Sequence, residues 1–573
     1  MREFTTAAKT ILQDRYLSNN ETIHERIITI CKYYGYDEDH SNRMMFYILN
    51  HWFMPSTPIL SNGGTNQGLP ISCFLNSMED TMESIIDTST QNKWISHLGG
   101  GIGTSFSNLR STGEDISSGG KTGGVIPHVV CLDSDTRAIS QGKLRRGSAA
   151  AYIHYTHPEI LEFLNIRKLQ GGGTGRKVFQ LNHGITIDNA FLEALESNKN
   201  IDLISPKTKQ KINSVPARDI WQLILTMRME LGEPYIVNLD TVNDNLPKHH
   251  VNKDWTLKVL QSNLCSEIML PTGIDYMSKN RTAVCCLGSV NLKYYRDWVT
   301  DHMFIRDCML FLDNVLQDFI NKGSKYPALK SAIHSSANER SIGLGAMGLH
   351  TLFQDEGIPF KSKEASALNI ECFRHIKNKT VGANRDLASL LGPCQDWKNS
   401  DKMSSPVRFS YTMAVAPTAN ISIIAGECSP CIEPISANIY SLNTLSGTFT
   451  IRNSSLKKLL ETKGKDTDEV WSSILENSGS VQHLKFLNKK EKELYLTAME
   501  IDQNAVVDMA NDRAVFIDQG QSVNLFLKGD IDKKELHDLH IKALGSGKNK
   551  SLYYLRSGSI KKTDYIITCF GCE

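Results

Sequence analysis

The sequence has no long apolar run and almost no net charge, and both absences narrow the class of protein. No segment reaches the roughly 18 consecutive apolar residues that a membrane-spanning helix needs. The net charge is +1 at neutral pH, whereas proteins that bind nucleic acids or membrane surfaces generally carry a basic excess. The N-terminus lacks the apolar core of a secretory signal. We therefore expect a cytoplasmic protein that binds neither nucleic acid nor a membrane.

The sequence also lacks the even, closely spaced cysteines of a secreted disulfide framework. Its 13 cysteines are scattered along 573 residues, and in a reducing compartment most such cysteines are small buried side chains. Two CxxC pairs, Cys428–Cys431 and Cys569–Cys572, are too far apart for the usual zinc ribbon. We expect no metal or cofactor bound to this chain.

Apolar segments that read as strands alternate with segments that read as helices, which is typical of an α/β fold. The expected strands are 235–240, 408–417 and 522–529, with a helix at 308–320. In the N-terminal region, Ser18, Asn19 and Asn20 offer an N-cap to a helix that ends at Gly35. A second apolar helix is expected over 44–54, and 95–125 is a long Gly/Ser-rich region.

Two glycine motifs look like nucleotide-binding loops but lack the required context. The motif GLGAMG (343–348) follows a charged segment, and its next acidic residues, Asp355 and Glu356, come too early for a dinucleotide fingerprint. The motif GGKTGG (119–124) has Asp115 where a phosphate-binding loop needs its first glycine. We therefore expect neither kind of nucleotide site at these motifs.

The stretch SNLCSEIMLPT (262–272) places an amide, a thiol and a carboxylate at alternating positions. In an extended segment Asn263, Cys265 and Glu267 would point to the same side, because side chains alternate between faces. Such a convergence is suited to chemistry, although a buried cysteine beside a surface turn explains the short stretch equally well.

The C-terminal CxxC is better explained as a mobile dithiol. Cys569 and Cys572 lie next to the end of the chain, so they could carry electrons to an internal disulfide by thiol exchange. Candidate internal partners are Cys73 and the adjacent Cys285 and Cys286, of which only one can face a given site.

Two further stretches allow more than one interpretation. Tyr553 and Tyr554 read first as ordinary core residues, although a tyrosine pair could also relay an electron and a proton. In VAPTANISII, a strand ends at Pro417 and the helix-like stretch after it has free backbone N–H groups that could hold an anion.

Together these motifs resemble the catalytic large subunit of class I ribonucleotide reductase. The resemblance extends over nearly the whole chain, and no single motif is unique to the family. It is carried by PSTPILSNGG, SCFLNS, GGGIGTSFSNLR, ISQGKLRRGSAAAYI, SNLCSEIMLPTG, AVCCLGSVNL, NERSIGLGAMGL, APTANISII, SLYYLRS and the terminal CxxC.

The resemblance implies a ten-stranded α/β barrel with Cys265 on a central finger loop. The implied division is an N-terminal helical region (1–50), the barrel (51–555) and a flexible redox tail (556–573). By analogy, Cys265 becomes a thiyl radical, Glu267 is the general base and Asn263 orients the sugar. Cys73 and Cys285 would protonate the leaving 2′-hydroxyl and end as a disulfide, which the tail pair Cys569 and Cys572 would reduce again.

The resemblance also implies the ligands and partners. A small subunit with a metal cofactor would supply the radical through Tyr553 and Tyr554, and thioredoxin or glutaredoxin would reduce the tail. The substrate would be a ribonucleoside diphosphate. Its expected contacts are Thr57, Ser72, Gly101, Thr418, Ala419, Asn420, Ile421 and Ser422.

Regulation by deoxynucleoside triphosphates or ATP is implied in the same way, at the interface of a homodimer. Asp80 and Arg110 match effector-binding residues, and Ser140, Gln141, Lys143 and Arg145 lie on the loop that would report the effector to the substrate site. Ser117 replaces a second arginine that is common in the family. The chain begins where an N-terminal ATP cone would have ended, so we expect no dATP shut-off through a cone.

Two other functions stay open. The first is a cobalamin-dependent, single-subunit reductase, which would not need the tyrosine pair. The second is an inactive nucleotide-binding homologue, which would not need all five expected cysteines together with Glu267.

Overall fold

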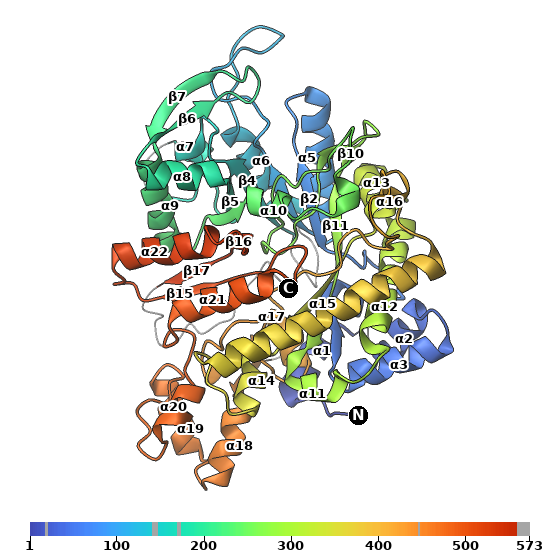
Figure 1. The fold of residues 1–573 in the computed structure, drawn as a ribbon, viewed down its shortest axis with the longest axis vertical. Helices are drawn as coiled ribbons and strands as arrows, with labels where there is room; N and C mark the ends of the chain where they lie inside the picture. Colours follow the sequence, from blue (N-terminus) through green and yellow to red (C-terminus); the bar gives the residue numbers. More distant parts are fainter. Residues whose placement is uncertain (18–20, 140–146, 169–172, 445–446, 558–573) are drawn as a thin grey trace.

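The central feature of the fold is a curled sheet with helices packed around its outside (Figure 1). The computed structural model describes residues 1–17, 21–139, 147–168, 173–444 and 447–557. Within these ranges, no helix is both long enough and apolar enough to span a membrane.

Five parallel strands form the first half of the sheet. In spatial order they are β2 (Cys73–Ser77), β3 (Gly101–Ser105), β4 (Ser148–His154), β5 (Asn182–Ile187) and β8 (Tyr235–Asn238). These strands are mostly buried along their length, as expected when helices cover one face of a parallel sheet and a packed interior covers the other. The covering helices include α5 (Met82–His97), α6 (Ile126–Ile139) and α9 (Ala217–Leu231).

The second half begins with β11 (Ala283–Asn291) and β12 (Ile342–Met347), which are also parallel. Segments 411–415 and 519–523 continue it through backbone hydrogen bonds. Among these, Leu344 N donates to Thr412 O at 2.9 Å, and Val415 N donates to Gly520 O at 3.0 Å. The last members are β15 (Leu525–Leu527), β16 (Ser551–Leu552) and β17 (Leu555–Ser557).

Two antiparallel seams join the halves, β11 with β2 and β16 with β8. Because both seams are present, the described strands and segments close into a ring of two opposed parallel halves. The α/β barrel class is therefore confirmed. The predicted strand 408–417 is irregular, and its only β-bridge among the described residues joins Val415 to Gln521.

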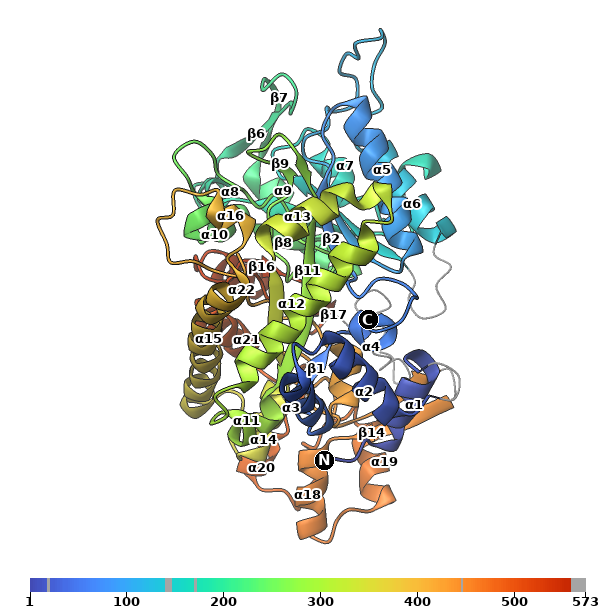
Figure 2. The ribbon, with the colours of Figure 1, turned by 90° about the vertical axis from the view of Figure 1, so that its right-hand side faces the viewer.

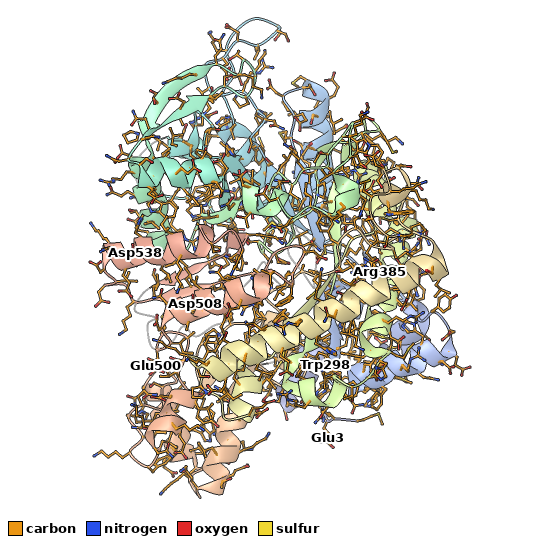
Figure 3. All side chains as sticks on the ribbon, viewed as in Figure 1. Glu3, Trp298, Arg385, Glu500, Asp508 and Asp538 are labelled. Atoms are coloured by element: carbon orange, nitrogen blue, oxygen red, sulfur yellow. The ribbon has the colours of Figure 1, made fainter. Side chains whose placement is uncertain are left out.

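Long helices cover the second half. They are α12 (Phe304–Gly323), α13 (Lys330–Glu339), α15 (Lys363–Leu391), α21 (Gln503–Ala514) and α22 (Lys533–Leu544). Figure 2 shows α12 running obliquely through the middle of the molecule, and α12 packs against α15. Figure 3 marks α15, α21 and α22 by Arg385, Asp508 and Asp538, with side chains filling the space between these helices.

The N-terminal region is helical, with α1 (Thr6–Arg15), α2 (Ile23–Tyr34) and α3 (Glu38–Leu49). Two of its predicted boundaries are wrong. The cap of α2 is Thr22, which forms a capping box with Glu25, because this pair satisfies two helix-end donors at once. The predicted helix 44–54 stops at Leu49, and β1 (Phe53–Pro55) pairs with β11.

A small helical unit projects from one end of the molecule (Figure 1). It contains the hairpin β13 (Ile439–Thr444) and β14 (Gly447–Arg452), followed by α18 (Ser454–Thr462), α19 (Asp468–Glu476) and α20 (Lys489–Leu494). Its own apolar core surrounds Trp471. The hairpin β6 (Asn200–Ile204) and β7 (Lys211–Pro216) lies at the opposite end.

Candidate active site

The segment that carries Cys265 runs through the interior of the barrel and contacts strands from both halves. Tyr152 Oη on β4 donates to Asn263 O at 2.7 Å. From the other half, Ser522 Oγ donates to Cys265 O at 2.7 Å, and Gly520 N donates to Glu267 O at 2.8 Å. Both halves of the barrel therefore donate hydrogen bonds to backbone carbonyls of the predicted finger loop. These bonds fix the position of the Cys265 thiol inside the barrel.

The tip of this loop is a turn, so the expectation of an extended segment is wrong. Ser266 has a positive φ of 64°, and Asn263 Oδ1 accepts the N–H groups of Glu267 at 3.1 Å and Ile268 at 3.2 Å. Asparagine favours such turns because its side chain can bond to backbone groups a few residues ahead. Asn263 Nδ2 is buried and has no hydrogen-bond partner among the described residues.

A small cleft lies at the tip of the loop. Cys265 and Glu267 line it from the finger loop, and Ser72 and Cys73 line it from the start of β2. The remaining lining residues are Ser56, Thr57, Pro58, Leu287, Gly288, Ser289, Ala416, Pro417, Thr418, Ala419, Asn420 and Ile421. The structure thus brings together residues that are widely separated in the sequence.

Cys73 and Cys285 are direct cross-strand partners on β2 and β11. Opposed residues of an antiparallel pair have Cα atoms about 4.5–5.5 Å apart, which is within the range of a disulfide. Burial raises the pKa of the Cys285 thiol, with Cys73 nearby as a further cause. Cys286 packs into the main core on the other face of β11, as the alternation of a strand requires.

The segment after Pro417 faces the same cleft. Thr418 has a positive φ of 53° and precedes α17 (Ala419–Ile424). Its Oγ1 accepts the N–H of Cys431 at 2.6 Å, which anchors the turn. Ser422 lies one turn further along and is not among the lining residues, and Gly101 pairs with Cys73 on the neighbouring strand.

Three tyrosine rings cluster beside the finger loop. The rings of Tyr553 and Tyr554 have centroids 4.4 Å apart, and Tyr235 lies 4.8 Å from the first ring and 5.1 Å from the second. Tyr553, Tyr235 and Cys265 belong to one buried apolar cluster, against which Tyr554 packs. The core explanation of the tyrosine pair and the relay explanation are both compatible with this packing.

Comparison with known proteins decides the family. The model for the ribonucleotide reductase barrel domain matches residues 71–405 and 401–555, and the model for the all-alpha domain of the same enzymes matches residues 2–68.

The chain belongs to the ribonucleotide reductase large-subunit family.

Individual members of the family match over most of their length. The ribonucleoside-diphosphate reductase large subunit of Invertebrate iridescent virus 3 is 37% identical, over 97% of this chain and 94% of that protein. The large subunit of Danio rerio is 30% identical, over 88% of this chain and 69% of that protein. The class Id ribonucleotide reductase alpha subunit of Actinobacillus ureae has a TM-score of 0.85 at 32% identity, covering 97% of both chains.

Two of the predicted effector residues, Asp80 and Arg110, are in direct contact. Arg110 Nε donates to both carboxylate oxygens of Asp80, at 2.9 and 2.8 Å. The loop residues Ser140, Gln141, Lys143 and Arg145 lie outside the described residues, as do Cys569 and Cys572 of the tail. The division of the chain at residues 50 and 555 stays a prediction.

Some residues at the site could not be found from the sequence. Ser522 Oγ lies 3.4 Å from Glu267 Oε2 as well as bonding to the finger loop, and Gln519 Nε2 lies 3.8 Å from Cys285 Sγ. In the sequence, Tyr235 could be recognised only as part of a predicted strand, with no sign that it packs on the tyrosine pair. No local pattern marks these residues, because only the closure of the barrel places them next to the reactive groups.

Proposed function

We propose that this chain reduces ribonucleoside diphosphates to 2′-deoxyribonucleoside diphosphates by means of a thiyl radical at Cys265. The observation that carries the proposal is a single cleft lined by Cys265, Glu267 and Cys73, with Cys285 directly opposite Cys73. A radical donor, a carboxylate and a reducible thiol pair are the groups that removal of a 2′-hydroxyl needs at one place.

Each group has one task in this scheme. The Cys265 thiyl takes the hydrogen from C3′ and returns it at the end, while Glu267 accepts the proton of the 3′-hydroxyl. The Cys73 and Cys285 thiols supply two electrons and two protons, so the 2′-hydroxyl leaves as water and the two sulfurs end joined as a disulfide. Cross-strand pairing supports this role, because it allows the bond without moving the barrel.

The rest of the cleft suits the remainder of the nucleotide. We place the diphosphate at Thr418–Ile421 and the ribose near Thr57 and Ser72, which all line the cleft. Asn263 Nδ2 has no hydrogen-bond partner among the described residues, so it is available to donate a hydrogen bond to a sugar hydroxyl. Gly101 N donates to Ser72 O at 2.6 Å, and Ser422 N donates to Thr418 O at 3.0 Å. We therefore assign both residues to the support of this site.

The radical would reach Cys265 from a small subunit with a metal cofactor, through Tyr554 and Tyr553. The packing of both rings in the cluster that contains Cys265 supports this route. We assign the return of electrons to Cys569 and Cys572, reduced in turn by thioredoxin or glutaredoxin. A cytoplasmic location remains a prediction from the sequence.

We further propose that a deoxynucleoside triphosphate or ATP binds at Asp80 and Arg110 in a homodimer. The Ser140–Arg145 loop would then report the effector to the substrate site. Helix α5 supports the dimer, because it exposes Met82, Ile86 and Trp94 at 64%, 55% and 40%. Met82 and Ile86 are four residues apart and so lie on one face of the helix, and exposed apolar side chains that gather in this way mark a surface that a partner can cover.

The test is an assay of CDP reduction by the chain together with its small subunit. We expect turnover in the native protein, none in Cys265→Ser and none in Tyr554→Phe. The matched control is Cys286→Ala, next to the reactive thiol but facing the other way, which should keep most of the activity. Turnover with adenosylcobalamin and no small subunit would favour the cobalamin-dependent alternative, and CDP binding without turnover would favour the inactive one.

A further inference from the structure

The hydroxyl of Tyr554 is hydrogen-bonded to an amide on the neighbouring half of the barrel. Asn182 Nδ2, at the start of β5, donates to Tyr554 Oη at 3.0 Å. The same nitrogen donates to Glu233 Oε1. Because an amide nitrogen carries two hydrogens and is never an acceptor, these two contacts use both hydrogens of the group.

Glu233 is a buried carboxylate with several donors around it. Arg167 Nη1 donates to its Oε1 at 2.6 Å, and the backbone N–H of His183 donates to its Oε2 at 2.9 Å. Only 1% of the Glu233 residue is exposed. Burial alone would raise the pKa of this carboxyl, but its contacts with His183 and Arg167 lower the pKa below its ordinary value.

The charge of Glu233 settles which end of the Asn182 amide faces Tyr554. An ionised carboxylate only accepts hydrogen bonds, so it selects the nitrogen of the amide and rejects the oxygen. The nitrogen that faces Glu233 also faces the phenol. The phenol oxygen therefore accepts from Asn182, and the phenol's own proton must point in another direction.

The ring of Tyr554 is supported on its other sides as well. It packs on Tyr553 and Tyr235, and the guanidinium of Arg556 lies 4.7 Å from its centroid. These contacts locate the ring, whereas the Asn182 bond acts on the oxygen that loses its proton on oxidation.

We propose that Asn182, oriented by Glu233, is a positioning residue for radical transfer at Tyr554. The inference rests on the proposed function. On oxidation, Tyr554 loses one electron to the radical of the small subunit and its phenol proton to water, because this residue is only partly buried. The Asn182 bond persists in the phenoxyl radical, because an oxygen without its proton still accepts. The Asn182 bond thus keeps the Tyr554 oxygen in one place in both the phenol and the phenoxyl form.

The experiment uses the holoenzyme with 3-aminotyrosine at position 554, which traps the radical there. A hydrogen bond to a phenoxyl oxygen lowers the largest g value in high-field electron paramagnetic resonance. We expect Asn182→Leu to raise that g value, and to reduce CDP turnover about three- to tenfold in the enzyme with natural Tyr554. If leucine prevents folding, Asn182→Ala removes the amide without adding volume.

A matched control and a second variant make the result specific. Asn399 Nδ2 donates to Tyr276 Oη at 2.9 Å, far from the relay in sequence and at the surface, so Asn399→Leu should leave the g value unchanged. Glu233→Gln should produce two radical populations, because a neutral amide accepts either end of Asn182. A single unchanged signal in Glu233→Gln would overturn the role given to Glu233.

The failure of this inference can be distinguished from the failure of the proposed function. If no radical forms at position 554 and Tyr554→Phe retains turnover, the relay itself is wrong. If the radical forms and Tyr554→Phe is inactive, but Asn182→Leu leaves the g value unchanged, only the positioning by Asn182 is wrong.

Discussion

Replacing Gly103 by alanine should displace the finger loop while leaving the barrel folded. Gly103 lies on β3, and a Cβ built there would be 2.2 Å from Ser262 O and 2.8 Å from Asn263 Cα. Both neighbours are backbone atoms, so no side-chain rotation can relieve the overlap. Reaching ordinary contact requires a shift of roughly 1 Å, and overpacking of this kind costs about 1–3 kcal/mol.

The larger effect is expected on catalysis, because the displaced backbone leads directly to Cys265. A misplacement of about 1 Å at a reacting group can cost on the order of 100-fold in rate. The assay compares CDP turnover and denaturant unfolding of Gly103→Ala with those of Gly382→Ala. Gly382 lies on α15 with nothing within 4 Å of its added Cβ, so its variant should be active. Turnover of Gly103→Ala within about twofold of the native value would refute the reasoning.

Three further predictions follow from other parts of the molecule. Burial raises the pKa of Glu339 to about 8 from 4.5, so the stability this group contributes is full below pH 4.5 and is lost as the pH rises to 8. Glu339→Gln should therefore raise the free energy of unfolding, measured with denaturant, more at pH 8 than at pH 5. The same increase at both pH values would contradict the raised pKa of Glu339. Cys569→Ser should give about one turnover with thioredoxin as the only reductant, and repeated turnover would rule out the tail dithiol as carrier. Asp80→Ala should weaken binding of the deoxynucleoside triphosphate by about tenfold or more in calorimetry, because it removes a charged partner of Arg110, and unchanged affinity would place the effector elsewhere.

The sequence was most informative where function depends on a residue type within a short motif. A thiol beside a carboxylate, two cysteines after β-like segments and a tandem tyrosine pair could all be recognised locally. The class of the fold was predictable too, because buried parallel strands and amphipathic helices differ in their apolar pattern. Helix ends were less predictable: the Thr22–Glu25 capping box took precedence over the polar residues before it.

Only the tertiary structure decided how these pieces meet. The closing of two opposed half-barrels pairs Cys73 with Cys285 and brings Ser522 to the finger loop. The same closure brings Asn182 and Glu233 to Tyr554. These contacts join residues far apart in the chain, and they depend on strand register and loop path. A local sequence pattern encodes neither, because both result from packing the whole barrel at once.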